Sequence, residues 1–289
     1  MTKRETAIIA SSDFSENDKL YVQRARQALP FLVRQAKAGK PIYYSDLADE
    51  INIPNARNLN YILGSIGNTL IHLGKKEGVE IPPLQSLVIN KRDELPGAGI
   101  SGFIKLADFS KLSKAQKHKV IAAQLTIIYA FPYWDWVLKK LAIEPIRIDV
   151  NKELDYAKNF GGGGESEHHK NFKLFVSKNP NVVGLGIKLL NGIIEYGLPS
   201  ADKIDVLFMD GNTMIGVEVK TNISNSADIL RGLFQCIKYK ALIEAEQIVK
   251  DEIPNFKVLL VLEGPLPENL ILVKNILGIE VVENVKFME

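Results

Sequence analysis

Three charged residues lie in two apolar segments of the C-terminal half of the chain. Asp205 stands near the start of the segment 204–209, and Glu218 and Lys220 end the segment 214–220. Successive side chains of a β-strand alternate between its two faces, so Glu218 and Lys220, two residues apart, should project from the same face. Buried charges are costly unless they bind a metal or pair with each other. The pattern therefore indicates a functional site rather than ordinary packing of a hydrophobic core.

The side chains in this set favour phosphodiester hydrolysis. Asp205 and Glu218 offer hard oxygen ligands for Mg²⁺, with Mn²⁺ as an alternative. The ion would act as a Lewis acid and neutralise charge developing on the phosphate, and Lys220 would orient or deprotonate the attacking water. Glu-x-Lys alone is more typical of a solvated strand face. Asp205, on a partner strand across the tight turn 210–212, strengthens the functional interpretation.

A long helix predicted over 226–250 adds two polar residues. Gln235 and Tyr239 are four residues apart and so share one helix face, although ordinary amphipathic packing would also explain them. Asp205, Glu218-Val219-Lys220 and Gln235-x-x-x-Tyr239 together resemble the PD-(D/E)xK family of restriction-endonuclease-like nucleases, and the last part is typical of its RecB-like branch. The resemblance covers about 161–289. It implies that Asp and Glu bind the metal, Lys serves the water, and the Gln-Tyr helix holds the site and the DNA backbone.

The same family carries an acidic residue on its first helix. Glu165 is preferred here, because it stands at the start of a helix predicted over 166–178 and in phase with its apolar stripe. Glu167 and Glu195 are alternatives. His168 or His169 could replace a carboxylate as ligand, but a surface histidine pair is the more ordinary interpretation.

The N-terminal half has the order of elements of a winged helix-turn-helix. Apolar spacing predicts helices over 19–38, 45–50 and about 55–73, with Ser45 and Asn55 as caps and Pro30 kinking or dividing the first helix. A strand over 84–89 and a turn over 95–99 follow. Helices over 110–128 and 133–142, and a strand over 146–150, complete this half.

Segments 43–48, 55–59, 82–88 and 95–97 resemble the winged-helix domain of alkylguanine DNA alkyltransferases. Residues 83–86 read Pro-Leu-Gln-Ser where that family has its Pro-Cys-His-Arg active site, so alkyl transfer is excluded. The resemblance implies that Tyr44 and Arg57 assist nucleotide flipping. Asn58 and Asn60, beside Arg57, carry amides suited to base edges. A generic helical domain with a surface arginine is the alternative interpretation.

Four glycines at 161–164 predict a flexible joint between the halves. The expected domains are a winged-helix-like DNA-reading domain over 1–150, a glycine-rich hinge over 151–164 and a nuclease domain over 165–289. A hairpin over 183–195, a strand over 256–262, a helix over 268–277 and a strand over 279–282 are also expected. The predicted fold class is α/β: a mainly helical N-terminal domain, then a restriction-endonuclease-like domain whose mixed sheet is flanked by helices.

Composition bounds the remaining interpretations. The chain has 289 residues, a length suited to two domains, and a net charge of +2, which neither requires nor excludes DNA. Its single cysteine, Cys236, rules out an internal disulfide and a cysteine-based zinc site, and fits the cytoplasm. Residues 1–14 do not resemble a signal peptide, and no apolar stretch is long enough for a membrane span.

These observations lead to a Mg²⁺-dependent DNA endonuclease, by analogy a restriction or phage-defence enzyme. A repair or junction-resolving nuclease is the alternative within the same class. A catalytically dead DNA-binding regulator is the alternative from another class, but a dead site would be free to lose Asp205, Glu218 and Lys220. DNA is the expected partner, and a homodimer is expected if one site per chain cuts both strands.

Overall fold

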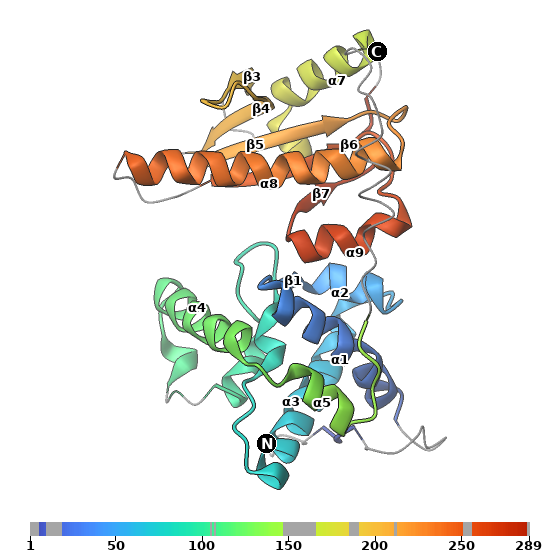
Figure 1. Ribbon diagram of the computed structural model, residues 1–289, viewed down its shortest axis with the longest axis vertical. Helices are drawn as coiled ribbons and strands as arrows, with labels where there is room; N and C mark the ends of the chain where they lie inside the picture. Colours follow the sequence, from blue (N-terminus) through green and yellow to red (C-terminus); the bar gives the residue numbers. More distant parts are fainter. Residues whose placement is uncertain are drawn as a thin grey trace. The chain divides into compact units, whose positions relative to one another are not determined.

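The computed structural model (Figure 1) divides the chain into two compact units, Met1–Ile148 and Asp149–Glu289. Glu165, the glycines at 161–164 and nearly all of the strand predicted over 146–150 fall outside the described part of the chain. The structure describes residues 6–9, 19–104, 106, 108–146, 166–184, 191–210, 213–250 and 256–287. Both units combine helices and strands, so the chain is a mixed α/β protein, as predicted.

Two long helices form the centre of the first unit. Helix α1 (Leu20–Ala38) packs against α3 (Leu59–Glu77) through apolar side chains at helical spacing, including Leu29, Leu32, Ile62 and Ile66, each at most 1% exposed. Pro30 lies inside α1 without dividing it. A proline removes one backbone hydrogen bond, and the apolar face buried on both sides of it offsets that loss.

Short elements connect these helices and differ in detail from the prediction. Helix α2 (Tyr44–Glu50) begins one residue earlier than expected, directly from strand β1 (Ile42–Tyr43), so Ser45 is not its cap. Asn55 does act as a cap, but for the 3-10 turn η1 (Ala56–Asn58) that precedes α3. The predicted strand 84–89 is a 3-10 turn (η2, Leu84–Leu87) that leads into β2 (Val88–Ile89), which pairs in parallel with β1. The turn forms because it buries Leu84 and Leu87, three residues apart, in the core.

The remainder of this unit is helical. The 3-10 turns η3 (Ala98–Gly102) and η4 (Phe109–Lys111) lead to α4 (Lys114–Ala130) and α5 (Trp134–Lys140). Helix α4 starts later than predicted because Ser113 and Gln116 form a capping box at its beginning.

In the described part of the second unit, five strands form one mixed sheet in the order β3-β4-β5-β6-β7. Strands β3 (Ile193–Gly197), β4 (Lys203–Asp210) and β5 (Thr213–Lys220) are antiparallel neighbours, whereas β6 (Phe256–Leu262) and β7 (Glu280–Val282) continue in parallel. The predicted hairpin of β4 and β5 is confirmed, with Val206 opposite Val217. Of the hairpin predicted over 183–195, Val183 ends a 3-10 turn (η5, Pro180–Val183) and residues 193–195 lie in β3, whereas most of the first arm lies outside the described residues.

Helices cover both faces of this sheet (Figure 1). Helix α7 (Glu167–Lys178) packs Phe172 and Val176 against one face, which includes Val217 and Val219. Helices α8 (Ser226–Val249) and α9 (Glu268–Leu277) pack against the other face around Leu260. The helices searched in the described residues include none that is long and apolar enough to cross a membrane.

Candidate functional site

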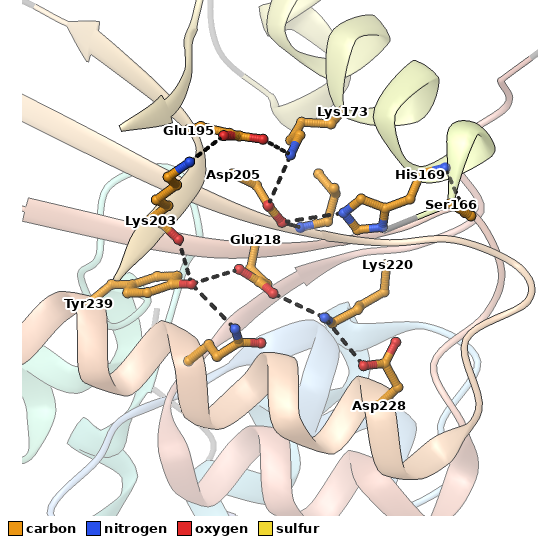
Figure 2. Close-up of polar contacts among 12 residues, drawn as sticks. Ser166, His169, Lys173, Glu195, Lys203, Asp205, Glu218, Lys220, Asp228 and Tyr239 are labelled. Carbon is orange, nitrogen blue, oxygen red and sulfur yellow. Dashed lines mark hydrogen bonds and ion pairs between the residues drawn. The ribbon is translucent and has the colours of Figure 1, made fainter. Parts of the chain in front are cut away.

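The candidate site lies where β4 begins and β5 ends. These ends are adjacent because the two strands run antiparallel, and the backbone N–H of Val219 donates to Asp205 Oδ2 at 2.9 Å. Glu218 and Lys220 both contact α8, which confirms that they project from one face. Asp205 instead contacts α7. The site therefore passes through the sheet from one helical layer to the other (Figure 2).

Glu218 is the most deeply buried carboxylate of the site, with 3% of its surface exposed. Its Oε1 lies 3.1 Å from Lys220 Nζ and its Oε2 lies 3.2 Å from the Tyr239 hydroxyl. Burial and the nearby charge of Asp205 raise the pKa of Glu218 to about 8, although Lys220 opposes that rise. Burial and Asp205 thus favour the protonated form of Glu218, and a bound cation would favour the ionised form.

Lys220 lies between two carboxylates. Its Nζ is 3.1 Å from Glu218 Oε1 and 3.4 Å from Asp228 Oδ1 at the start of α8. Burial alone would lower the pKa of Lys220, but attraction to these carboxylates outweighs burial and raises it. Gly232 gives this lysine room, because a Cβ there would stand 3.0 Å from Lys220 Cε. Lys220 is consequently a charged donor in this structure, rather than a base.

Asp205 is the ionised member of the carboxylate pair. Burial would raise the pKa of Asp205, but the His169 ring and the Val219 N–H outweigh burial and lower it. His169 Nε2 lies 3.9 Å from Asp205 Oδ2, which is too long for a good hydrogen bond and short enough for electrostatic attraction. Asp205 and Glu218 thus differ in protonation, as two carboxylates sharing one buried site should.

Helix α7 contributes a lysine that was not predicted from the sequence. Lys173 is 4% exposed, and its Nζ lies 3.0 Å from Glu195 Oε1 and 3.8 Å from Asp205 Oδ1. A sequence signal for it did exist: Lys173 directly follows buried Phe172 and lies three residues before buried Val176, so it stands beside the apolar stripe of the helix.

The alternatives for a third acidic or histidine ligand lie in different places. Glu165 cannot be placed, because it lies outside the described residues. The Glu167 side chain is 78% exposed and points toward Lys170. His168 Nε2 bonds Glu263 at 2.8 Å, and Glu195 is paired with lysines. Of these alternatives, His169 is the one that the structure brings to Asp205.

Gln235 and Tyr239 approach the site from α8. The Tyr239 hydroxyl lies 2.8 Å from the carbonyl oxygen of Lys203 and 3.2 Å from Glu218 Oε2, so it ties Glu218 to the start of β4. Gln235 Nε2 donates to that hydroxyl at 3.4 Å, and its buried Oε1 has no partner in the described structure. Burial raises the pKa of Tyr239, which keeps this hydroxyl protonated.

The donor set of the site is compatible with a magnesium ion. Among the described residues, no three His, Cys, Asp or Glu side chains form a ready-made metal site. Mg²⁺ requires fewer protein ligands, because it commonly keeps several waters and takes one or two carboxylates. Asp205 and Glu218 supply two. Burial and the charge of Asp205 raise the pKa of Glu218, and a divalent cation would relieve the repulsion between the two carboxylates.

The residues proposed to contact DNA lie in the first unit. Arg57 and Asn58 are exposed in η1, and Asn60 is exposed in the first turn of α3. Tyr44 is half-buried, and its hydroxyl accepts a hydrogen bond from Gly97 N at 3.1 Å, which gives it a packing role. Sequence reasoning overlooked Tyr61, which follows Asn60 and is 64% exposed.

Comparisons of the chain with protein-family models, curated proteins and solved structures found no match.

Proposed function

We propose that the second unit is a Mg²⁺-dependent deoxyribonuclease with a PD-(D/E)xK type of fold. The observation that carries this proposal is the placement of Asp205 and Glu218, two carboxylates, on adjacent strands, with Lys220 two residues after Glu218 and in contact with it. The pair is buried and its charges repel, as the raised pKa of Glu218 reflects. Such a cost is typical of functional sites, where shifted pKa values cluster.

Each side chain has a distinct part in the proposed reaction. Asp205 and Glu218 would hold the metal, which supplies Lewis acidity and positive charge beside the scissile phosphate. Lys220 carries a proton and lies within 3.4 Å of both Glu218 and Asp228, so it is suited to orient the attacking water or stabilise phosphate charge. Tyr239 fixes the orientation of Glu218 by contacting its Oε2.

The first unit is proposed as a winged-helix-like DNA reader. Its support is the exposure of Arg57, Asn58 and Asn60 around the N-terminal turn of α3, since recognition helices contact bases with their first residues. A reader joined to a nuclease suits restriction or phage defence, with DNA as substrate and a homodimer where both strands are cut. Repair or junction resolution by the same chemistry, and DNA binding without cleavage, are the competing functions.

Incubation of the full chain with supercoiled plasmid, modified and unmodified, tests this proposal. Nicked or linear product should appear with Mg²⁺ or Mn²⁺ and disappear with EDTA. Asp205→Asn should abolish cleavage while the circular dichroism spectrum stays unchanged. Full activity in EDTA contradicts the proposal. Tight DNA binding without cleavage, at any divalent cation tested, would identify the regulator instead.

A further inference from the structure

Glu195 adopts an unusual backbone conformation for a strand residue. It lies in β3 with φ of 53°, the left-handed region that side-chain-bearing residues seldom occupy. Residues held in such conformations cluster at functional sites. The carboxylate of Glu195 contacts two lysines, with Oε2 2.7 Å from Lys203 Nζ and Oε1 3.0 Å from Lys173 Nζ (Figure 2). These contacts bring the pKa of Glu195 down to about 2, so it is fully ionised at neutral pH.

Lys173 contacts Glu195 more closely than it contacts Asp205. At 3.0 Å its ammonium group is hydrogen-bonded to Glu195, whereas at 3.8 Å its interaction with Asp205 Oδ1 is only electrostatic. Because Lys173 is buried, water screens its charge weakly, and a position nearer Asp205 would strengthen that attraction considerably.

Asp205 Oδ1 is also the oxygen best placed for a metal. Oδ2 is taken by the backbone N–H of Val219 and faces His169. Among the described residues, Oδ1 accepts no hydrogen bond, and Lys173 is the cation nearest to it. A lysine moved into hydrogen-bonding range of Oδ1 would compete with a divalent cation for the same lone pairs.

We propose that Glu195 is a positioning residue that draws Lys173 away from Asp205 and so keeps Oδ1 open to the metal. The proposal rests on the metal-dependent function proposed above. It gives Glu195 a role different from that of a direct ligand. The left-handed φ of Glu195 accompanies this contact of its carboxylate with Lys173.

The test is the affinity of the full chain for Mn²⁺, measured by isothermal titration calorimetry at one pH and without DNA. Glu195→Gln should raise the dissociation constant about tenfold, the scale expected when a buried charge about 4 Å from its partner moves about 1 Å closer. Lys173→Met alone should not weaken binding, because it removes the competitor. The double variant should bind as Lys173→Met does. Lys170→Met, which changes an exposed lysine on the same helix, is the matched control and should bind as the wild type does.

Each of the other outcomes would overturn the proposal or the metal site on which it rests. Weak binding by the double variant would make Glu195 a metal ligand, and weak binding by Lys173→Met would make Lys173 a support for Asp205; either overturns the proposal. Unchanged binding by Glu195→Gln also overturns it. If the wild type binds no Mn²⁺, the proposed metal site itself fails. Should Glu195→Gln not fold, Glu195→Asn replaces it, since asparagine tolerates the left-handed conformation.

Discussion

Asp205 and Glu218 lie on adjacent antiparallel strands, and the charge of the first, added to burial, raises the pKa of the second to about 8. The two carboxyl groups cannot both be ionised cheaply without a cation between them. The contacts that the site does have, from the Val219 N–H to Asp205 and from Lys220 and Tyr239 to Glu218, hold both groups in place. The arrangement of this pair therefore lowers the stability of the metal-free protein.

That cost predicts a gain in stability from Glu218→Gln. The folded-state pKa of about 8 exceeds the ordinary value of 4.5, so the folded protein holds a proton that the unfolded chain releases between these values. The resulting stabilisation is complete below pH 4.5 and is lost as pH rises through about 8. Without divalent cations, Glu218→Gln should raise the melting temperature at pH 8–9, by about 2–4 °C for each kcal/mol gained.

Thermal denaturation in EDTA across pH 4 to 9 measures this effect. The variant and the wild type should have similar melting temperatures near pH 4, where Glu218 is protonated in both the folded and the unfolded chain. They should diverge as pH rises from 4.5 to about 8 and stay apart above that. Parallel profiles over the whole range would show that the folded protein does not raise the pKa of Glu218. Glu268→Gln, which changes an exposed glutamate at the start of α9, provides the comparison.

The sequence pattern predicted the secondary structure around the site well. Strand β6 and helix α9 have the predicted bounds, and the β4–β5 hairpin places Asp205 beside Glu218, because strand alternation and turn chemistry are local properties. It did not predict Lys173 as a neighbour of Asp205. That contact depends on which face of the sheet α7 covers and on the positive φ of Glu195. Both are set by packing between segments distant in sequence.

The N-terminal half gives a second case in which the local sequence pattern did not determine the secondary structure. Val88 and Ile89 form a strand as predicted, yet the four residues before them form a 3-10 turn. An apolar run of six residues does not distinguish a strand from a turn whose side chains three apart are buried. Tertiary contacts with α1 and α3 settle the choice by burying Leu84 and Leu87 completely.

Lys220→Met should impair catalysis far more than DNA binding. The raised pKa of Lys220 keeps it charged, so its loss removes a donor aimed at the reacting groups and should lower the cleavage rate by roughly 100-fold or more. Single-turnover cleavage gives the rate, and fluorescence anisotropy with Ca²⁺ in place of Mg²⁺ gives the affinity. A variant that binds weakly but cuts at the normal rate would make Lys220 a phosphate contact.

Tyr44→Phe should lower the stability of the protein and leave its DNA affinity nearly unchanged. The Tyr44 hydroxyl accepts a hydrogen bond from Gly97 N at 3.1 Å, and its removal leaves that N–H without this partner, at a cost of about 1 kcal/mol. Chemical denaturation should show this loss. DNA affinity should stay close to that of the wild type, because the half-buried ring is retained. A large loss of affinity at unchanged stability would instead favour direct contact of the hydroxyl with a nucleotide.

Arg57→Ala should weaken DNA binding without disturbing the fold. Arg57 is exposed in η1, and its backbone N–H, which donates to Asn55 Oδ1 at 3.0 Å, survives the substitution. An arginine that reads a base edge contributes about 1–3 kcal/mol and sharpens sequence preference. Binding is best measured in the Asp205→Asn background, so that the DNA stays intact.

The salt dependence of that binding shows what Arg57 contacts. Loss of one phosphate contact should weaken binding to all sequences alike and lower the slope of log affinity against log salt by about 1. Loss of a base contact should leave the slope nearly unchanged and reduce discrimination between sequences. Lys139→Ala, at an exposed position on α5, is the control. If neither variant changes binding even at low salt, where phosphate contacts are strongest, Arg57 does not contact DNA, and the nuclease unit must recognise its substrate through other residues.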